Sequence, residues 1–425
     1  MYALYSVLLS LSFLLYAPVY FLKTKLIRRK PLHLAARLGC RVPSRHQGTR
    51  SLWIHAVSVG EVLSLQRLIR ALKAVHPDWS VYFSTLTISG FDVARNHLSG
   101  ADRVFFVPLD FRWVVNRFFR SLEPDLFVLA ESEFWPNLLR SARRFTRGVL
   151  LLNGRISERS FRRYRRLGRL PRRVLSSIDR WLVQTELDGR RLSDIGVEPV
   201  SIEIAGNLKC EMDLPLLSGE QIRSLRTEIG ASPHQTLVVA GSTHRGEENV
   251  LLDAYARARA RNGGLKLILA PRHPERTGEV EKACAALSLR FRCRTAGGGN
   301  WDVLILDTIG ELYRFYAIAD VTFIGGSLVP WGGQNLLEPA FYSKPVFFGP
   351  HMDNFALLAK TFLERDAARV VDGPERLMDL FLPADAEELK RMGERAKQTL
   401  ESLRGATEKS LKAIEDMMSR PFPSS

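Results

Sequence analysis

Several motifs that often reveal a protein's chemistry are missing from this sequence of 425 residues. No Asp-x-Asp pair occurs, so the carboxylate pair with which many enzymes hold a metal-bound diphosphate is absent. No Cys-x-x-Cys pair occurs among the four scattered cysteines, which are Cys40, Cys210, Cys284 and Cys293. This spacing argues against a disulfide framework and against a zinc site, and it fits a reducing compartment. We therefore expect neither a metal nor a cofactor.

Short apolar runs rich in β-branched and aromatic residues alternate with helix-like stretches along most of the chain. This alternation predicts parallel sheets covered by helices on both faces, and it occurs twice. The fold class is therefore α/β, with two doubly wound, Rossmann-like domains. The predicted strands are 52–57, 81–85, 104–108, 126–130, 149–152 and 181–184, followed by 237–240, 265–270, 303–306, 321–324 and 345–348.

The domain boundary is predicted near residues 202–214, where the balance of charge changes and Pro215 interrupts the pattern. We expect an apolar N-terminal anchor with a basic flank, a basic N-terminal domain, a C-terminal domain, and a pair of C-terminal helices. The corresponding ranges are 1–30, 31–205, 206–384 and 385–425.

The excess of positive over negative charge lies entirely in the first half of the chain. Residues 1–205 hold 33 Lys and Arg against 16 Asp and Glu, whereas residues 206–425 are nearly neutral. Nine arginines stand between Arg155 and Arg173, where Glu158 is the one acidic residue. Such a cluster is typical of a surface that binds phosphate groups, whether of a nucleic acid, a membrane or an anionic lipid.

The N-terminus favours the membrane among those partners. Residues 1–22 are nearly uncharged and largely apolar, and five Lys and Arg follow at 23–30. A helix of that length is about 33 Å long, against a hydrocarbon core of about 30 Å. Positive charge after the apolar run predicts that the rest of the chain lies in the cytoplasm. The apolar helix itself either spans the membrane or lies in one leaflet. We expect an anionic membrane surface as partner and no nucleic acid.

Polar residues directly after the predicted strands are the site candidates, because parallel sheets bind ligands at the carboxyl ends of their strands. The most informative stretch is Gly325–Ala340, where a strand ends in a glycine-rich loop and a helix that carries Glu338. A second strand–glycine–helix turn stands at Val57–Glu61. Taken singly, each candidate is more often a cap or a turn than a ligand, so the argument rests on their coincidence with strand ends.

Eight segments, taken together, resemble the Kdo transferases, which move 3-deoxy-D-manno-oct-2-ulosonic acid (Kdo) from a CMP-activated donor to a lipid A precursor. They run in the family's order over nearly the whole chain, and the resemblance implies the two-domain GT-B fold and the cytoplasmic face of the inner membrane. The segments are His55–Glu61, Glu131–Asn137, Asn153–Ser157, Gly206–Lys209, Ala240–His244, Ala270–Pro274, Asp307–Leu312 and Gly325–Ala340.

The resemblance implies that Glu61 is the general base that takes the proton from the acceptor hydroxyl in an inverting transfer. Glu131 and Glu133 would orient Glu61 or the sugar, or would form a buried capping network. The residues expected on the acceptor side are Ser58, Gly60, Glu131, Glu133, Asn153 and Arg155. Those expected on the donor side are Lys209, Ser242, His244, Pro271, Arg272, His273, Ile309, Gly310, Glu311, Gly326, Ser327, Asn335 and Glu338. In this scheme, Arg272, Lys209 and the backbone amides around Gly326–Ser327 and Gly310 hold the CMP phosphate.

The chain departs from the family pattern at Gln334, Trp331 and Ser132, where His, a basic residue and Thr are usual. Gln334 cannot titrate, so a proton-transfer role at that position is doubtful. Three other functions stay open: another nucleotide-sugar transferase acting on an anionic lipid, a sugar-nucleotide epimerase, and a non-catalytic phospholipid or nucleic-acid binder. An epimerase normally needs no apolar N-terminal segment.

The missing Asp-x-Asp pair leads to a prediction about metals. CMP carries a single phosphate, which gains one charge as its bond to the sugar breaks, and fixed cations can stabilise that charge. We expect transfer to persist after exhaustive treatment with EDTA. Loss of activity that Mg²⁺ or Mn²⁺ restores would contradict this prediction.

Overall fold

The computed structural model describes residues 2–27, 33–46, 50–131, 133–212, 214–382 and 385–422. The chain divides into two compact units. Unit 1 comprises Met1–Met212 and Arg404–Ser425, and unit 2 comprises Asp213–Leu403. The bounds differ from the expected ranges, because residues 206–212 stay with unit 1 and the two C-terminal helices belong to different units.

Unit 1 is built on a seven-stranded sheet in which every pairing is parallel. The strand order is β3-β2-β1-β4-β5-β6-β7. The bounds are β1 Ser51–Ala56, β2 Ser80–Thr85, β3 Arg103–Phe106, β4 Leu126–Ala130, β5 Val149–Gly154, β6 Arg180–Val183 and β7 Ile202–Ile204. Six of these strands match predicted runs. The short edge strand β7 falls where the sequence predicted only a domain boundary.

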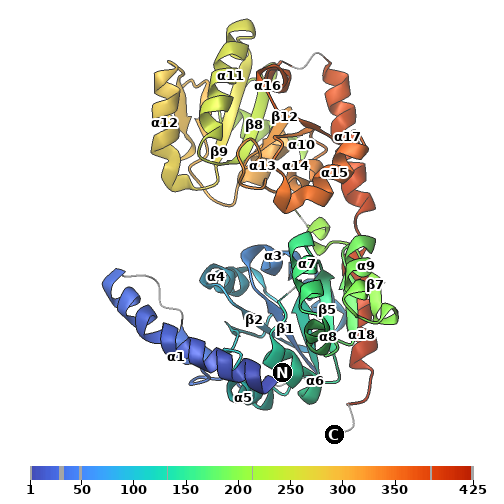
Figure 1. The fold of residues 1–425 in the computed structure, drawn as a ribbon. Helices are drawn as coiled ribbons and strands as arrows, with labels where there is room; N and C mark the ends of the chain where they lie inside the picture. The colour runs from blue at the N-terminus through green and yellow to red at the C-terminus, as the bar shows by residue number, and fades with distance from the viewer. Residues whose placement is uncertain are drawn as a thin grey trace. The chain divides into compact units, whose positions relative to one another are not determined.

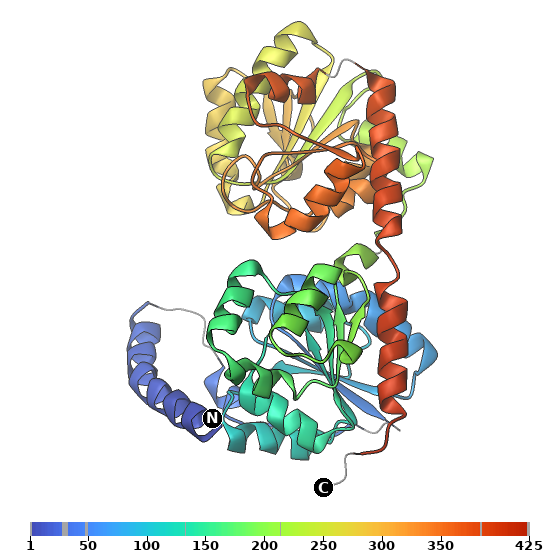
Figure 2. The ribbon, with the colours of Figure 1, turned by 45° about the vertical axis from the view of Figure 1, so that its right-hand side comes forward.

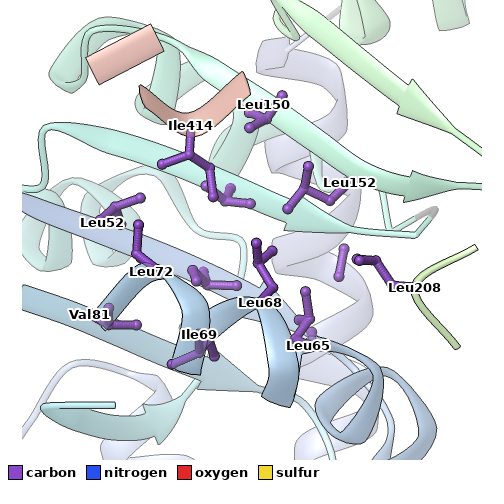
Figure 3. Packing of buried hydrophobic residues seen from close by; sticks show 14 of the residues in the cluster. Leu52, Leu65, Leu68, Ile69, Leu72, Val81, Leu150, Leu152, Leu208 and Ile414 are labelled. Atoms are coloured by element: carbon purple, nitrogen blue, oxygen red, sulfur yellow. The ribbon is translucent and has the colours of Figure 1, made fainter. Parts of the chain in front are cut away.

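Helices cover both faces of the unit 1 sheet, because alternate side chains of a strand point to opposite faces. Leu52 and Ile54 of β1 pack in one cluster, and Trp53 between them packs in the other. Figure 3 shows the first cluster, in which Ile414 lies near Leu150. The helices are α2 Leu34–Arg37, α3 Val59–Val75, α4 Ile88–His97, α5 Arg112–Leu122, α6 Pro136–Phe145, α7 Glu158–Arg166, α8 Arg169–Leu175, α9 Glu186–Asp194 and α18 Ala406–Met418.

The return of the C-terminus to unit 1 is explained by this packing. Helix α18 buries Ile414, Met417 and Met418 in the same cluster as Leu208. The carboxylate of Glu211 accepts hydrogen bonds from the backbone N–H groups of Gly405 and Thr407, at 2.6 and 3.2 Å. The segment after β7 and the last helix therefore complete the unit 1 core together (Figures 1 and 2).

Helix α1 (Tyr2–Ile27) packs against unit 1 through its first half. The rings of Phe13 and Phe111 meet edge to face with their centroids 5.5 Å apart, and Asn137 donates a hydrogen bond to the Ser6 hydroxyl at 3.2 Å. Within the described residues, no helix has the combination of length and apolar character needed to span a bilayer. Part of the expected basic flank, residues 28–30, lies outside the described residues.

Unit 2 repeats the design with a second parallel sheet of order β10-β11-β9-β8-β12-β13-β14. Its strands are β8 Thr236–Thr243, β9 Leu265–Pro271, β10 Phe291–Cys293, β11 Val303–Ile305, β12 Val321–Ile324, β13 Val346–Phe348 and β14 Ala368–Val370. Its helices are α10 Gly219–Glu228, α11 Glu247–Arg261, α12 Thr277–Ala286, α13 Leu312–Ile318, α14 Leu337–Phe341, α15 Ala356–Glu364, α16 Pro374–Phe381 and α17 Ala386–Ser402. The prediction of two doubly wound parallel sheets is confirmed.

Each sheet contains one point at which the strand order reverses. In unit 1 this point lies between β1 and β4, and in unit 2 it lies between β8 and β12. Loops leave such neighbouring strands in opposite directions, which opens a crevice at their carboxyl ends where ligands bind. The two segments that stood out in the sequence, Val57–Glu61 and Gly325–Ala340, begin directly after β1 and β12.

Candidate functional site

Glu61 lies in the first turn of α3, directly beyond the end of β1. Ser58 is the N-cap of this helix, and its side chain accepts a hydrogen bond from the Glu61 N–H. The Glu61 carboxylate accepts from the Val57 N–H at 2.7 Å and from the Ser58 hydroxyl at 2.9 Å. This reciprocal arrangement is a variant of a helix capping box. It fixes the carboxylate in one orientation.

The electrostatic surroundings of Glu61 favour its protonated form more than water does. Only 8% of the residue is exposed, and this burial raises the pKa of its carboxyl. The negative charge of Glu131 raises the pKa further, while Lys209 and the two hydrogen bonds oppose the shift. A carboxyl with a raised pKa is a better proton acceptor, provided that it remains ionised at the working pH.

Gly60 has no steric reason to be glycine in the structure. A methyl group built at this position would meet no atom within 4 Å. The space at Gly60, the residue before Glu61, is therefore open, at the edge of the sheet where ligands bind.

A network of polar contacts joins the ends of β4 and β5 to the segment after β7. Asn153 donates to Glu131 at 3.3 Å and accepts from the Leu208 N–H at 3.0 Å. Lys209 forms an ion pair with Glu131 at 2.9 Å. Glu131 and Asn153 both have positive φ angles, 58° and 56°, and such backbone strain in non-glycine residues clusters at functional sites.

The structure places Lys209 in unit 1, where it belongs to the surroundings of Glu61. The expected contact of Lys209 with the donor stays a prediction, and the structure shows that Lys209 pairs with Glu131 and belongs to unit 1. Glu133 is half-buried after β4, and burial raises the pKa of its carboxyl. Arg155 is exposed beyond the end of β5. Ser132 lies outside the described residues.

The unit 2 site is organised by a carboxylate that the sequence did not single out. Glu247, the first residue of α11, is fully buried. It accepts hydrogen bonds from the backbone N–H groups of Ser327 and Leu328, both at 2.8 Å, and also from those of Gly326 and His244. The amides of Gly326 and Ser327 are thus already occupied. The expected contact of these amides with a phosphate would require the phosphate to displace Glu247.

Gly325 is required by the close approach of two backbones. A Cβ atom at this position would lie 2.4 Å from the carbonyl oxygen of Ser242 and 2.5 Å from the Cα of Thr243. Ser242 has a positive φ of 56°, so strain again marks the end of a strand at the reversal point. Glycine here lets the end of β12 lie directly against the end of β8.

His244 follows β8 and is surrounded by residues that follow β9 and β12. Its ring stacks on Trp331 with centroids 4.9 Å apart, and its Nε2 lies 3.1 Å from Nε2 of Gln334. The ring of His273 approaches it edge-on, with centroids 6.0 Å apart. Burial lowers the pKa of His244, and the nearby His273 and Arg272 lower it further. Both departures from the family pattern that the structure describes, Gln334 and Trp331, therefore contact the same histidine.

Asn335 and Glu338 form a polar pair at the start of α14. Asn335 donates to Glu338 at 3.2 Å and accepts from the Leu337 N–H at 3.1 Å. Burial raises the pKa of Glu338, while Asn335 and Arg272 act in the opposite direction. Glu338 is the second residue of a five-residue helix, which confirms the predicted helix around it.

The remaining candidates of unit 2 lie at the ends of β9 and β11. Pro271 is the last residue of β9, and the exposed Arg272 and His273 follow it. The Arg272 N–H donates to the Thr243 carbonyl at 2.9 Å, which ties β9 to β8. Beyond β11, Ile309 is 87% exposed, Gly310 has a φ of 90°, and Glu311 pairs with Arg294 at 3.4 Å. In the part of the chain that the structure describes, no three His, Cys, Asp or Glu side chains could jointly hold a metal ion.

Comparison with known proteins identifies relatives that cover nearly the whole chain. A family model described as 3-deoxy-D-manno-octulosonic-acid transferase matches residues 33–212, which end where the first segment of unit 1 ends. The 3-deoxy-D-manno-octulosonic acid transferase of Bordetella pertussis is 33% identical over 90% of each chain. That of Haemophilus influenzae is 30% identical over 91% of this chain and 92% of its own. A crystal structure of a glycosyltransferase from Rickettsia africae matches with a TM-score of 0.60, covering 88% of this chain and 99% of that chain, at 12% identity.

The charges around Glu61 lead to a prediction about its titration. Replacing Glu131 by Gln removes a nearby negative charge, so the pKa of Glu61 should fall. Replacing Lys209 by Gln removes a nearby positive charge, so the pKa should rise. Carboxyl ¹³C shifts of labelled glutamate, followed against pH, would measure both changes, and the Glu61→Gln variant would identify the resonance. Shifts of the same sign in the two variants would show that these charges do not control Glu61.

Proposed function

This chain is a glycosyltransferase of the 3-deoxy-D-manno-octulosonic acid (Kdo) transferase family, and we propose that it moves Kdo from CMP-Kdo to a lipid A precursor. The single observation that carries the proposal is the carboxylate of Glu61, which two hydrogen bonds fix at the reversal point of the unit 1 sheet. We also propose that the transfer inverts the anomeric configuration, with Glu61 as the general base.

In this mechanism Glu61 accepts the proton of the attacking hydroxyl. A sugar alcohol is a poor nucleophile, and removal of its proton during attack lowers the barrier. The bond between the acceptor oxygen and the anomeric carbon forms as the bond from that carbon to the phosphate oxygen breaks. The electron pair leaves with CMP. A carboxylate oxygen can accept more than one hydrogen bond, so the bonds from Val57 and Ser58 orient Glu61 and leave it able to receive the proton.

The residues around Glu61 are proposed to hold and orient the acceptor. Ser58 and Gly60 form the turn that presents the base. Glu131, Asn153 and Lys209 form one connected network, which sets the charge near the base. Glu133 and Arg155 extend the same edge of the sheet and offer further polar groups to a sugar.

The unit 2 site is proposed to bind the CMP-sugar donor. Arg272 and His273 supply charge and hydrogen-bond donors for the phosphate, in place of the amides that Glu247 occupies. Asn335 and Glu338 suit the two hydroxyls of a ribose. The segments of Pro271 and of Ile309–Glu311 are proposed to contact the cytidine, while Ser242, Gly326 and Ser327 shape the floor of the site. Tighter binding of CMP than of UMP or UDP would separate this donor from those of other nucleotide-sugar enzymes.

The location of the enzyme is proposed to be the cytoplasmic face of the inner membrane. The support lies in the apolar sequence of α1 and in the arginines of α7 and α8, both of which belong to unit 1. Residues 206–425, which hold the proposed donor site, are nearly neutral. The basic surface of residues 1–205 is therefore proposed to contact the membrane and the lipid acceptor.

The Glu61→Gln variant tests the proposed mechanism. Glutamine keeps the size of the side chain but cannot take a proton, so transfer should fall by roughly 10²–10⁴-fold, while folding and CMP binding are retained. Glu186→Gln is the matched control, because Glu186 also lies in the first turn of a helix that follows a strand of unit 1. Turnover near that of the control would remove Glu61 from the mechanism.

Truncation of the N-terminus tests the proposed location. Removal of residues 1–22 should weaken binding to vesicles that contain anionic lipid without abolishing it, because Lys and Arg near such a surface contribute about 1 kcal/mol each. The residual binding should decrease as salt rises, since exposed charges are screened over about 8 Å at physiological ionic strength. Flotation with anionic and zwitterionic vesicles would measure both effects. Equal recovery on the two vesicle types would rule out an electrostatic contribution.

A further inference from the structure

Unit 1 contains an apolar cavity that the proposed mechanism does not use. It has a volume of about 300 Å³, and every side chain that lines it is Tyr, Phe, Pro, Leu or Val. Its walls come from α1, from the segment between β4 and α6, and from α7 and α8, and include Tyr5, Phe134, Tyr164 and Val174. Apolar cavities of about half this volume bind benzene. The space is large enough for a longer hydrocarbon.

Two of the three tyrosines that line the cavity, Tyr2 and Tyr5, bond to the protein through their hydroxyls. The hydroxyl of Tyr5 bonds to Asp110, and that of Tyr2 donates to the carbonyl of Arg173 at 3.2 Å. Their rings, and not their polar atoms, are therefore what the cavity offers to a ligand. Asp110 also accepts from the N–H groups of Asn137 and Leu138 at the start of α6, so α1 is fixed against unit 1 beside the cavity.

Guanidinium groups border this apolar space. The side chain of Arg163 lies over the ring of Tyr164 at 5.4 Å, and that of Arg140 lies over the ring of Tyr2 at 4.7 Å. Leu167 and Leu170, which also line the cavity, are 49% and 50% exposed. An apolar space with an exposed leucine edge and neighbouring arginines is complementary to an amphiphile that has a hydrocarbon chain and an anionic headgroup.

The cavity is connected by the chain itself to the surroundings of Glu61. Phe134 and Pro136 of its wall follow Glu131, which forms the ion pair with Lys209, by three and five positions. Helix α7 begins just beyond the end of β5 and is nine residues long, which is about 13 Å. A headgroup at the strand ends and a chain in the cavity would thus lie within the reach of one lipid molecule.

We propose that this cavity binds one acyl chain of the anionic lipid that accepts the sugar, with phosphate of that lipid at Arg140 and Arg163. The inference rests on the proposed function for the identity of the lipid. The cavity itself, however, can be tested without any transfer reaction.

Binding of alkyl phosphates tests the cavity directly. Affinity for hexyl, octyl, decyl and dodecyl phosphate, measured below their micelle concentrations, should rise about three- to four-fold per methylene until the cavity is full. Val174→Trp fills the space and should weaken binding of dodecyl phosphate at least tenfold. Val200→Trp is the control, because Val200 is 97% exposed and does not line the cavity. The proposal would be overturned if the affinity did not depend on the length of the alkyl chain, or if the two variants bound dodecyl phosphate equally well.

Kinetics then tests whether the chain belongs to the acceptor. Val174→Trp should raise the KM for an acylated acceptor about tenfold and leave the KM for its deacylated headgroup unchanged. If dodecyl phosphate binding falls while the KM for the acylated acceptor does not change, the cavity holds a bilayer lipid and the assignment to the acceptor is wrong. If Val174→Trp does not fold, as judged by circular dichroism, Leu170→Ser replaces it. This variant should also weaken dodecyl phosphate binding and raise the KM for the acylated acceptor. Absence of transfer by the unmodified enzyme would contradict the proposed function, whereas the binding series would still decide on the cavity.

Discussion

Parallel strand pairing is the constraint on which both candidate sites depend. Because every paired strand in the two described sheets runs parallel, the carboxyl ends of all strands in a sheet meet at one edge. Residues far apart in the sequence, such as Glu61, Glu131 and Asn153, reach the same edge in this way. The reversal of strand order between β1 and β4, and again between β8 and β12, then opens a crevice at a defined place on that edge.

The two buried carboxylates at these strand ends, Glu61 and Glu247, differ in how many hydrogen bonds they accept, and this difference suits them to different roles. Glu61 and Glu247 both stand in the first turn of the helix that follows the strand at the reversal point. Glu247 accepts hydrogen bonds from four backbone N–H groups. Its carboxylate therefore fixes the loop after β12. Glu61 accepts two hydrogen bonds through its carboxylate, and the space at the neighbouring Gly60 is open. The same residue type thus serves as an internal hydrogen-bond acceptor in unit 2 and as the proposed proton acceptor in unit 1.

The strands and the site edge could be predicted because apolar runs and the polar residues that flank them are local signals. The three-residue edge strands β7, β10 and β14 could not, because so short a segment carries little pattern and depends on its neighbour for pairing. The partner of Lys209 was also hidden, since Glu131 lies far from it in the sequence. Glu247 was overlooked because a Glu after Gly246 reads as an ordinary helix start. Only the folded loop shows that its carboxylate takes the amides that seemed free for phosphate.

The division of unit 1 into two chain segments has a consequence for how such enzymes can diversify. Unit 2 is an insertion within unit 1, since the chain leaves after Met212 and returns at Arg404. A protein cut at residue 212 would lack the helix that covers Leu150 and Leu152 with Ile414. A recombination event that exchanged only the end of the gene would therefore separate unit 1 from part of its own core. Replacement of the inserted segment as a whole, with both junctions kept in place, would leave the core of unit 1 intact.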